Sequence, residues 1–406
     1  MNLKVARYLH SRCMTMRPLA FSLAWSLINF RGSLIARMVA EGHDVVAAAP
    51  DEEPEVLERL AAMGVAFRRT PMARTGTNPL RDLHTLWHYA RLMRAERPDV
   101  VIAYTQKPII YGGLVSRWMG RRFFAIMSGL GYVYSAEADG RRWLRAVVSR
   151  LYRAGVRRAG CIFVFNGDDH RLMLDSGIVS PDQPVMQVPG SGVDIRHFAE
   201  QPMPDGPFTF LMMGRLMRDK GVGEYVEAAR IIRARRPDAR FLLLTRPESE
   251  NPTGYTAADL QVWRDAGLIE FLPETRDVRP FIASAHAFVL PSFYREGLPR
   301  TILEALATGR PVITTDLPGC REPIRPGING LLVPPRDAPT LAAAMERMIA
   351  DPARVEAMGQ AARQTAVDIY DVDKVNALLL DVMQLRGGLG VEARAPSSAM
   401  LMPGRA

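Results

Sequence analysis

Short apolar runs alternate with amphipathic segments along most of this chain of 406 residues. The runs are rich in β-branched and aromatic side chains, as in strands that are buried on both faces of a sheet. The segments between them carry apolar residues at helical spacing, which is the order of elements in successive βαβ units. The pattern therefore predicts an α/β protein with doubly wound parallel sheets.

The predicted strands fall into two series. The first series comprises residues 19–23, 44–49, 65–69, 100–104, 123–127, 162–165 and 185–188. The second comprises residues 208–213, 241–245, 269–272, 287–290, 312–315 and 330–333. Proline and glycine cluster between the two series at residues 202–207, where neither a helix nor a sheet can continue. We therefore expect two Rossmann-like domains, over residues 17–200 and 201–369.

Three further segments lie outside these domains. Residues 1–16 precede the first strand and are interpreted as an extension or as a start placed too far upstream. Residues 370–386 predict a C-terminal helix that can cross back to the first domain. Residues 387–406 are rich in glycine, proline and serine, a composition typical of a disordered tail.

Basic residues outnumber acidic ones, with 52 Lys and Arg against 43 Asp and Glu. The net charge of +9 favours anionic partners, such as phosphorylated small molecules, anionic lipid or nucleic acid. No run approaches the ~20 apolar residues that span a bilayer, and residues 18–30 lack the cleavage site of a signal peptide. The three cysteines are far apart and form no zinc or disulfide pattern, which favours a reducing compartment.

One stretch in the second series has the chemistry of an anion site. Pro299 suits the first position of a helix, where the N–H group that proline lacks is not needed. The amides of Arg300, Thr301 and Ile302 then have no intrahelical acceptor. These amides and the helix dipole predict a site for a diphosphate.

Two glutamates flank this helix start. Glu304 lies one turn inside the helix, where its carboxylate can accept two hydrogen bonds from a vicinal diol. Glu296 precedes the helix and is expected to face the same cleft. Surface carboxylates are also common near helix N-termini for reasons of charge alone, so this stretch by itself leaves the function open.

A second stretch follows the first strand of the second series. Gly214 permits a tight turn there, and Arg215 and Lys220 can converge on a phosphate at the C-terminal edge of the sheet. The arginine fork and the lysine charge together suit a diphosphate leaving group. No G-x-G-x-x-G or Walker lysine motif accompanies them, which argues against a dehydrogenase or a P-loop enzyme.

Together these stretches resemble the nucleotide-sugar domain of glycosyltransferase family 4, whose members are retaining enzymes of the GT-B fold. The resemblance covers nearly the whole chain. It depends on residues 42–46, 192–198, 214–221, 309–313 and 327–333 and on the Glu-x7-Glu spacing of Glu296 and Glu304. It implies that the first domain binds the acceptor and that the second binds the nucleotide sugar.

The resemblance also implies roles for individual residues. It places Arg215 and Lys220 on the donor diphosphate, Glu304 on the ribose and Glu296 against the donor sugar, so that Glu296, Arg215 and Lys220 form the catalytic set. The residues expected to line the donor site are Gly32, Gly214, Arg215, Lys220, Glu296, Gly297, Leu298, Pro299, Arg300, Thr301 and Glu304. No metal or other cofactor is implied, because basic side chains and helix amides do the work of a cation.

Three other segments, residues 26–32, 105–108 and 128–132, are similar to a bacterial subgroup of this family. That subgroup builds lipid-linked surface saccharides from UDP-sugars, often N-acetylhexosamines. Many family members have a histidine near the donor sugar, after the strand that matches residues 123–127. This chain has Ser128, Gly129 and Leu130 there, so no histidine role carries over.

Seven arginines crowd the helix predicted from Arg141 to Arg158. Leu144, Val147, Val148 and Leu151 recur in it at helical spacing, which predicts a stripe packed against the core. The arginines are then either a solvated face or a contact surface for anionic lipid headgroups. We favour the lipid surface, and no recognisable nucleic-acid-binding motif accompanies the charge.

The sequence therefore predicts transfer of a sugar, an N-acetylhexosamine or a hexose, from a UDP-sugar to a saccharide linked to undecaprenyl diphosphate, with retention of configuration. We expect the protein to be cytoplasmic and peripheral on the inner face of the cell membrane. The alternatives are a nucleotide-sugar epimerase with the same donor domain and a non-catalytic subunit that recruits a glycosyltransferase to the membrane. The intact Arg215, Lys220, Glu296 and Glu304 argue against such a subunit.

Overall fold

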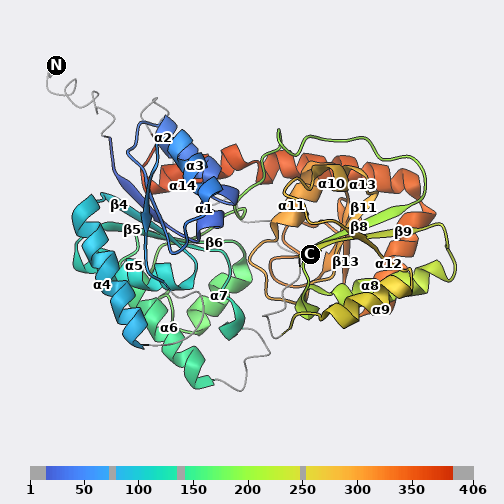
Figure 1. Ribbon diagram of the computed structural model, residues 1–406, viewed down its shortest axis with the longest axis horizontal. Coiled ribbons are helices and arrows are strands. Elements are labelled where there is room, and N and C mark those ends of the chain that lie inside the picture. Colours follow the sequence, from blue (N-terminus) through green and yellow to red (C-terminus); the bar gives the residue numbers. More distant parts are fainter. Residues whose placement is uncertain (1–14, 73–78, 135–141, 247–252, 387–406) are drawn as a thin grey trace, which may run out of the picture.

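Two parallel sheets with helices on both faces lie side by side in the computed structural model, which describes residues 15–72, 79–134, 142–246 and 253–386 (Figure 1). The predicted α/β class with two doubly wound domains is confirmed. The predicted disordered tail lies outside the described residues, as does the predicted extension up to residue 14.

The N-terminal domain is built on a seven-stranded sheet of order β3-β2-β1-β4-β5-β6-β7. Its strands are β1 (Pro18–Phe21), β2 (Val46–Ala49), β3 (Ala66–Arg69), β4 (Val100–Tyr104), β5 (Arg122–Met127), β6 (Cys161–Val164) and β7 (Val185–Gln187). Its helices are α1 (Ala24–Asn29), α2 (Gly32–Ala40), α3 (Pro54–Ala62), α4 (Pro79–Glu96), α5 (Gln106–Trp118), α6 (Arg142–Val156) and α7 (Gly167–Asp175). Successive side chains of a strand point to opposite faces, so alternate residues of the central strands enter two buried clusters, one on each face.

The C-terminal domain has a six-stranded sheet of order β10-β9-β8-β11-β12-β13. Its strands are β8 (Thr209–Arg215), β9 (Arg240–Arg246), β10 (Glu270–Leu272), β11 (Ala287–Leu290), β12 (Val312–Thr315) and β13 (Gly330–Val333). Its helices are α8 (Val222–Arg233), α9 (Ala257–Asp265), α10 (Arg279–Ala283), α11 (Arg300–Ala307), α12 (Ala338–Ala350) and α13 (Pro352–Thr365), followed by a π turn (Ala366–Tyr370) and α14 (Val372–Met383). All predicted strands of both domains are present, with ends shifted by no more than two residues.

The chain passes from the first domain to the second between Val188 and Val193, which belong to the buried cores of different domains. This passage precedes the Pro-rich segment that we expected at the boundary. The Pro-rich segment lies along the C-terminal domain. There the Arg310 guanidinium donates to the carbonyl oxygens of Gln201 at 2.8 Å and Pro202 at 2.7 Å.

Helix α14 returns to the N-terminal domain across the top of Figure 1. Its residues Val375 and Leu380 are buried in the same cluster as Leu34 of α2. A parallel backbone bridge between Val193 and Asp371 joins the two segments that cross between the domains. The last helix therefore belongs to the core of the first domain, although the preceding helix belongs to the second.

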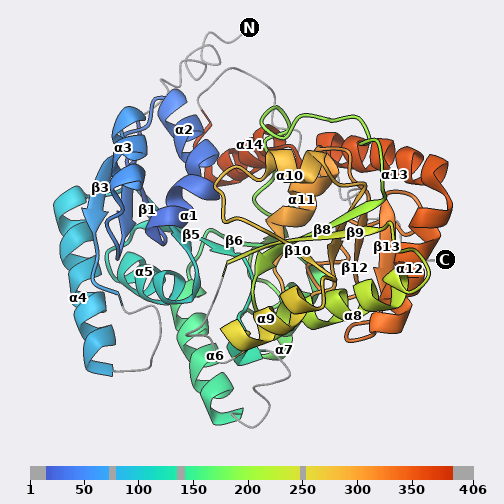
Figure 2. The ribbon, with the colours of Figure 1, turned by 45° about the vertical axis from the view of Figure 1, so that its right-hand side comes forward.

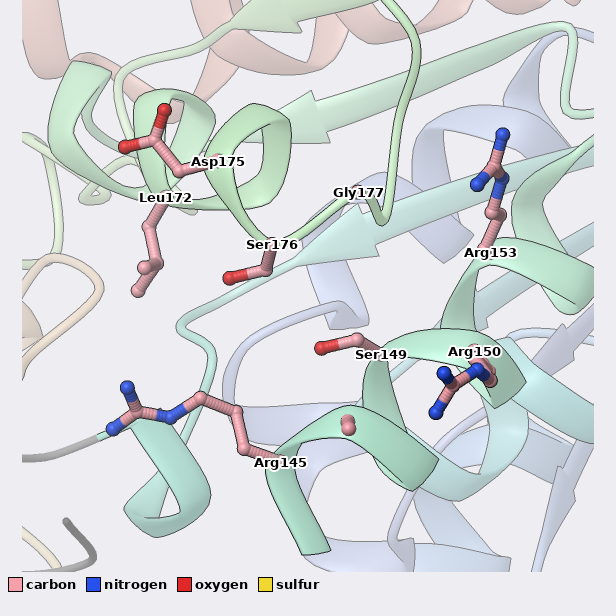
Figure 3. Close-up of a pocket in the computed structure, with 9 residues that line it drawn as sticks. Arg145, Ser149, Arg150, Arg153, Leu172, Asp175, Ser176 and Gly177 are labelled. Atoms are coloured by element: carbon pink, nitrogen blue, oxygen red, sulfur yellow. The ribbon is translucent and has the colours of Figure 1, made fainter. Parts of the chain in front are cut away.

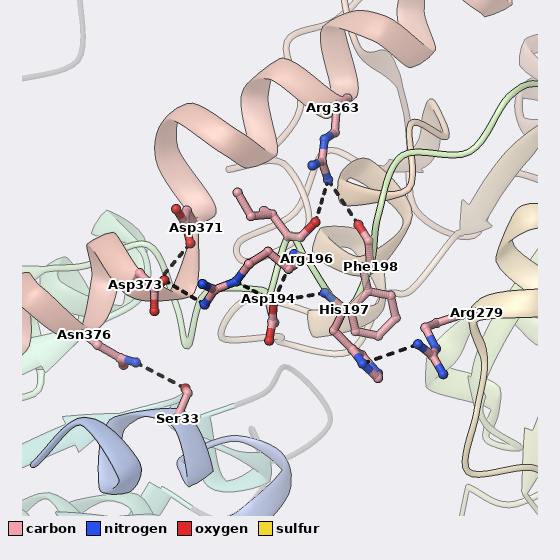
Figure 4. A network of polar contacts seen from close by, with 11 residues as sticks. Ser33, Asp194, Arg196, His197, Phe198, Arg279, Arg363, Asp371, Asp373 and Asn376 are labelled. Carbon is pink, nitrogen blue, oxygen red and sulfur yellow. Dashed lines mark hydrogen bonds and ion pairs between the residues drawn. The ribbon is translucent and has the colours of Figure 1, made fainter. Parts of the chain in front are cut away.

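Polar contacts fix this crossing on its outer side (Figure 4). Arg196 donates to the carboxylate of Asp373 at 2.9 Å, which links the first crossing segment to the start of α14. Asn376 of α14 donates to the hydroxyl of Ser33 on α2 at 3.2 Å. These contacts hold the start of α2 in place beside the crossing.

Helix α6 approaches α5 at two glycines. A Cβ atom on Gly113 of α5 would overlap the backbone of Gly155 on α6, so the two helices touch closely there. The α6 side chains that are buried are Ser149, Tyr152 and Val156. This close approach sets which face of α6 is buried.

The predicted burial of the apolar stripe on α6 is wrong for two of its four residues. Val147 and Leu151 are 43% and 39% exposed, and the neighbouring Trp143 is 70% exposed. The face with Ser149 and Tyr152 packs inward instead, because the close approach of Gly155 to Gly113 turns this face toward α5. Of the predicted basic helix, Arg141 lies outside the described residues.

Candidate active site

The two stretches that the sequence singled out meet at the C-terminal edge of the second sheet. The strand order reverses between β8 and β11, so the loops that follow these strands lie next to one another. Arg215 ends β8, Lys220 ends a short 3-10 turn, and Glu296 follows β11 and precedes α11. Such a reversal point is where α/β sheets bind ligands.

Lys220 and Glu296 form an ion pair at this point, with side chains 12% and 11% exposed. The Glu296 carboxylate also accepts a hydrogen bond from the Ser292 hydroxyl at 3.0 Å. The Lys220 ammonium lies 5.5 Å from the centre of the Tyr294 ring. A pair this well buried is a poor source of stability but holds both charged groups in defined positions.

Gly221 lets the chain turn directly from Lys220 into α8. Its φ of 76° lies in the left-handed region that glycine adopts readily. A Cβ atom here would overlap the carbonyl oxygen of Pro291, which follows β11. The turn therefore holds Lys220 against the loop that carries Glu296.

Glu304 lies inside α11 with its carboxylate 3.0 Å from Nε of Arg300. Burial raises the pKa of Glu304 to about 7, although the charge and hydrogen bond of Arg300 oppose this change. A carboxyl group that is perturbed in this way beside a helix N-terminus is a strong candidate for ligand binding.

Helix α11 begins one residue later than predicted. Pro299 has a ψ of 119° and is the residue before the helix. The Ile302 amide donates to the Pro299 carbonyl oxygen at 3.2 Å. The prediction of a free amide at Ile302 is therefore wrong, because the first turn is tightened by a bond between residues three apart. Arg300 and Thr301 supply the first two amides of the helix.

The other predicted donor-site residues take varied positions. Gly214 lies beside Arg215 near the end of β8, with open space where a Cβ atom would be. Burial raises the pKa of Tyr294, and the positive charge of Arg215 opposes this change. Leu298 packs against the cores of both domains. Gly32 is the first residue of α2, on the opposite side of the cleft.

Gly297 touches the N-terminal domain. A Cβ atom on it would overlap the carbonyl oxygen of Ser128, and its own carbonyl oxygen accepts from the Asn166 side chain at 2.9 Å. Ser128 and Gly129 stand where many family members have a histidine. Their backbone therefore contacts the C-terminal domain at Gly297.

Two carboxylates for which we expected no role link the domains beside Gly297. Asp169 pairs with Arg295 at 2.8 Å and is fully buried, and Asp168 pairs with Arg321 at 2.6 Å. Both lie in the first turn of α7, which Asn166 caps by accepting from the Asp169 amide. An Asn that caps the helix after a buried strand was the available sequence signal.

The N-terminal wall of the cleft comes from the loops after β1 and β4, between which the first sheet reverses its order. The Arg300 guanidinium lies 5.5 Å from the centre of the ring of Phe30, which ends α1, the helix that follows β1. Thr105 follows β4 with a φ of 66°, and such backbone strain costs about 1–3 kcal/mol and is commonest at functional sites. The two reversal points therefore meet across the cleft.

Neither a metal cluster nor a membrane span is found in the part of the chain that the structure describes. No three His, Cys, Asp or Glu side chains in these residues group as metal ligands. None of the helices described is both long and apolar enough to cross a bilayer.

Two family models match the two domains. The "Glycosyl transferase 4-like domain" matches residues 30–191, and "Glycosyl transferases group 1" matches residues 194–365. The chain belongs to glycosyltransferase family 4. This glycosyltransferase has the two-domain GT-B fold, as its sequence predicted.

Three proteins illustrate the similarity of this glycosyltransferase to known ones. It is 24% identical to the N,N'-diacetylbacillosaminyl-diphospho-undecaprenol alpha-1,3-N-acetylgalactosaminyltransferase of Campylobacter jejuni, over 80% of this chain and 87% of the relative. It is 23% identical to the UDP-Gal:alpha-D-GlcNAc-diphosphoundecaprenol alpha-1,3-galactosyltransferase of Escherichia coli, over 75% and 81% of the two chains. The structure of Anabaena Alr3699/HepE in complex with UDP has a TM-score of 0.73 at 18% identity and matches 91% of this chain and 100% of that one.

Proposed function

We propose that this glycosyltransferase transfers a sugar, an N-acetylhexosamine or a hexose, from a UDP-sugar to a saccharide linked to undecaprenyl diphosphate, with retention of configuration. The names of the two relatives specify diphosphoundecaprenol-linked acceptors, and one of them specifies UDP-Gal as the donor. The structure with similar architecture contains UDP. Donor and acceptor classes are thus supported by separate observations.

The proposal rests on one observation, which is that Lys220, Glu296 and the first turn of α11 lie together. It puts a buried cation, a carboxylate and free helix amides around one point of the cleft, opposite the N-terminal domain. A diphosphate needs the cation and the amides, and a sugar hydroxyl needs the carboxylate. The carboxylate of Glu304, further along α11, is available to the ribose diol.

Departure of UDP is the step that these residues would assist. Negative charge grows on the β-phosphate as the bond to the sugar breaks, and fixed positive groups stabilise that charge without reorganisation. Arg215, Lys220 and the amides of Arg300 and Thr301 supply such groups from the protein alone. We therefore propose a metal-independent reaction in which Glu296 contacts the donor sugar.

We propose that α6 contacts the anionic surface of the inner face of the membrane. Trp143, Val147 and Leu151 present exposed apolar area there. Arg150 and Arg153 of α6 and Arg157, which directly follows this helix, line a shared hollow with Arg117 of α5. Each basic residue near an anionic surface contributes about 1 kcal/mol to binding.

A pocket of about 600 Å³ lies between α6 and α7 on this side of the molecule (Figure 3). Arg145, Arg150 and Arg153 line it from α6, and Asp175 and Ser176 line it from the end of α7. Figure 2 shows α6 at the edge of the N-terminal domain, away from the C-terminal sheet. The surface is therefore free to meet a bilayer while the cleft keeps its donor.

Turnover of UDP-sugars with and without a synthetic undecaprenyl-diphosphate-linked N-acetylhexosamine tests the reaction. We expect a product that contains both sugars, with the anomeric configuration of the donor retained in its NMR spectrum. Turnover of UDP-sugar alone to an epimer would instead support the epimerase. Inversion at the anomeric carbon would contradict the proposed stereochemistry.

Sedimentation with anionic vesicles tests the membrane surface. Replacing Arg150, Arg153 and Arg157 with Gln should release the protein, and 1 M salt should act likewise because the screening length falls to about 3 Å. The matched control replaces three C-terminal-domain arginines, Arg233, Arg235 and Arg236. Equal sedimentation of both triple variants would remove α6 from the proposal.

A further inference from the structure

Arg31 is a buried arginine on the N-terminal wall of the cleft. Only 5% of the residue is exposed, and its guanidinium lies 4.2 Å from the centre of the Tyr104 ring and 6.0 Å from that of Phe165. Within the described residues, the hydrogen bond shown for its side chain runs from Nη1 to the Ser191 hydroxyl at 2.8 Å. Its Nε is buried without an acceptor.

A second buried arginine in the same chain shows how a structural arginine is accommodated. Arg310 has no exposed surface and donates from all three guanidinium nitrogens to backbone carbonyl oxygens. Its acceptors include Ile282 at 3.2 Å, Gln201 at 2.8 Å and Pro202 at 2.7 Å. Burial of a charged group without such partners is unfavourable. Arg31 lacks them, so its position calls for an acceptor from outside the fold.

The surroundings of Arg31 favour an anion as that acceptor. Burial lowers the pKa of Arg31 to about 10; the charge of Tyr104 opposes this change and the charge of Arg300 adds to it. The Arg300 guanidinium also lies against Phe30, the residue before Arg31. Arg300 already pairs with the Glu304 carboxylate, whereas no ion pair is shown for Arg31 within the described residues, so an anion at the N-terminus of α11 would offset the charge of Arg31.

We infer that Arg31 binds a phosphate group of a diphosphate at the N-terminus of α11, across the cleft from Arg300. This inference rests on the proposed function, which supplies the diphosphate. An arginine fork binds phosphate oxygens through two parallel hydrogen bonds, and the free Nε–H of Arg31 is one arm of such a fork. The Tyr104 and Phe165 rings keep the guanidinium dry, which strengthens its attraction to a phosphate.

Two diphosphates reach this cleft in the proposed reaction. One belongs to the donor, and the other links the acceptor saccharide to its lipid. Both present the same oxygens to Arg31, so the chemistry alone does not separate them. Binding of each must therefore be measured.

Calorimetric titration of the full-length protein with inorganic pyrophosphate and with UDP tests the inference. Arg31→Gln should weaken pyrophosphate binding by about tenfold or more, since a charged hydrogen bond is lost. Arg31→Lys retains the charge without the fork, so its pyrophosphate affinity should lie between that of the wild type and that of Arg31→Gln. The control is Arg37→Gln, which removes an exposed arginine of α2 that pairs with Glu41 and should leave the affinity unchanged.

The two titrations and an acceptor assay separate the outcomes. Loss of UDP affinity in Arg31→Gln assigns Arg31 to the donor, whereas an increased KM for the lipid-linked acceptor with unchanged UDP affinity assigns it to the acceptor. Unchanged pyrophosphate binding in Arg31→Gln overturns the inference. Wild-type protein that binds pyrophosphate through Arg31 but does not bind UDP would support the inference while contradicting the proposed donor.

Thermal unfolding distinguishes this role from a structural one. Arg31→Met replaces the unneutralised charge with an apolar chain of similar length, so we expect an unchanged or higher Tm together with lost pyrophosphate affinity. A clear fall in Tm would show that the arginine serves the fold, and would overturn the inference.

Discussion

Replacement of Glu304 with Gln should stabilise the free enzyme at alkaline pH while weakening its binding of UDP. Burial in α11 raises the pKa of this carboxyl group from an ordinary value of 4.5 to about 7. The folded state therefore binds the proton more tightly than the unfolded state does. Its stability consequently falls as the pH rises from about 4.5 to about 7, and the whole loss is present above pH 7.

The size of this effect follows from the two pKa values. One pKa unit corresponds to about 1.36 kcal/mol, so the raised pKa of Glu304 lowers the free energy of unfolding by about 3 kcal/mol at pH 8, where the buried group is ionised, and by about 1 kcal/mol at pH 5, where the group ionises only in the unfolded state. Gln has nearly the same shape and no charge to bury. The free energy of unfolding of Glu304→Gln should therefore exceed that of the wild type by these amounts, with the larger difference at pH 8.

Urea unfolding of both proteins at pH 5 and pH 8 measures the gain, with the exposed Glu356→Gln of α13 as control. Calorimetry at pH 8 should show UDP affinity reduced about tenfold or more, because hydrogen bonds from the ribose to a charged acceptor are lost. The wild-type affinity relative to that of the variant should also fall below pH 7, as Glu304 becomes protonated. A stability gain that is equal at both pH values, or an unchanged UDP affinity, would refute the reasoning.

Three further substitutions test other parts of the cleft. Lys220→Ala should lower kcat by about 10²-fold, because it removes positive charge from the departing diphosphate, and it should also lower Tm, because it leaves the buried Glu296 unpaired; steady-state kinetics near wild type would contradict the first expectation. Gly297→Ala should reduce kcat and increase the radius of gyration measured by small-angle X-ray scattering, since the added Cβ atom displaces Ser128. The same substitution at the unobstructed Gly214 is the control for the scattering measurement. Asp169→Asn should lower Tm in calorimetric scans, because unpairing one member of a buried ion pair costs about 3–5 kcal/mol, whereas Asp175→Asn at the other end of α7 should not.

Much of the fold follows from local patterns in the sequence. Strands buried on both faces need continuous apolar runs, and these runs mark every strand to within two residues. The residues that end β8 and precede α11 are also recognisable, because glycine, proline and charged residues at fixed spacing are required wherever a strand turns into a helix beside a ligand. The sequence singled out Arg215, Lys220, Glu296 and Glu304, and the structure brings Lys220 and Glu296 together as an ion pair.

Other features depend on contacts between residues far apart in the chain. The buried face of α6 is set by the approach of Gly155 to Gly113, and a helical stripe of apolar residues does not reveal which neighbour comes closest. The pairing of Asp169 with Arg295 exists only once the two domains have met. In the sequence alone, nothing distinguishes these residues from ordinary surface residues.

Arg31 illustrates the same difference between what local sequence shows and what depends on distant contacts. The sequence places it beside Gly32 in a segment similar to a bacterial subgroup, but nothing local tells a solvated arginine from a buried one. Its burial against Tyr104 depends on the end of β4, and the contact of the preceding Phe30 with Arg300 depends on the other domain. The sequence by itself thus determined the elements and the residues at their ends, because backbone propensity and periodic burial are local. Only the tertiary structure decided which charges lie together in the cleft, because the free energy of a charge depends on everything packed around it.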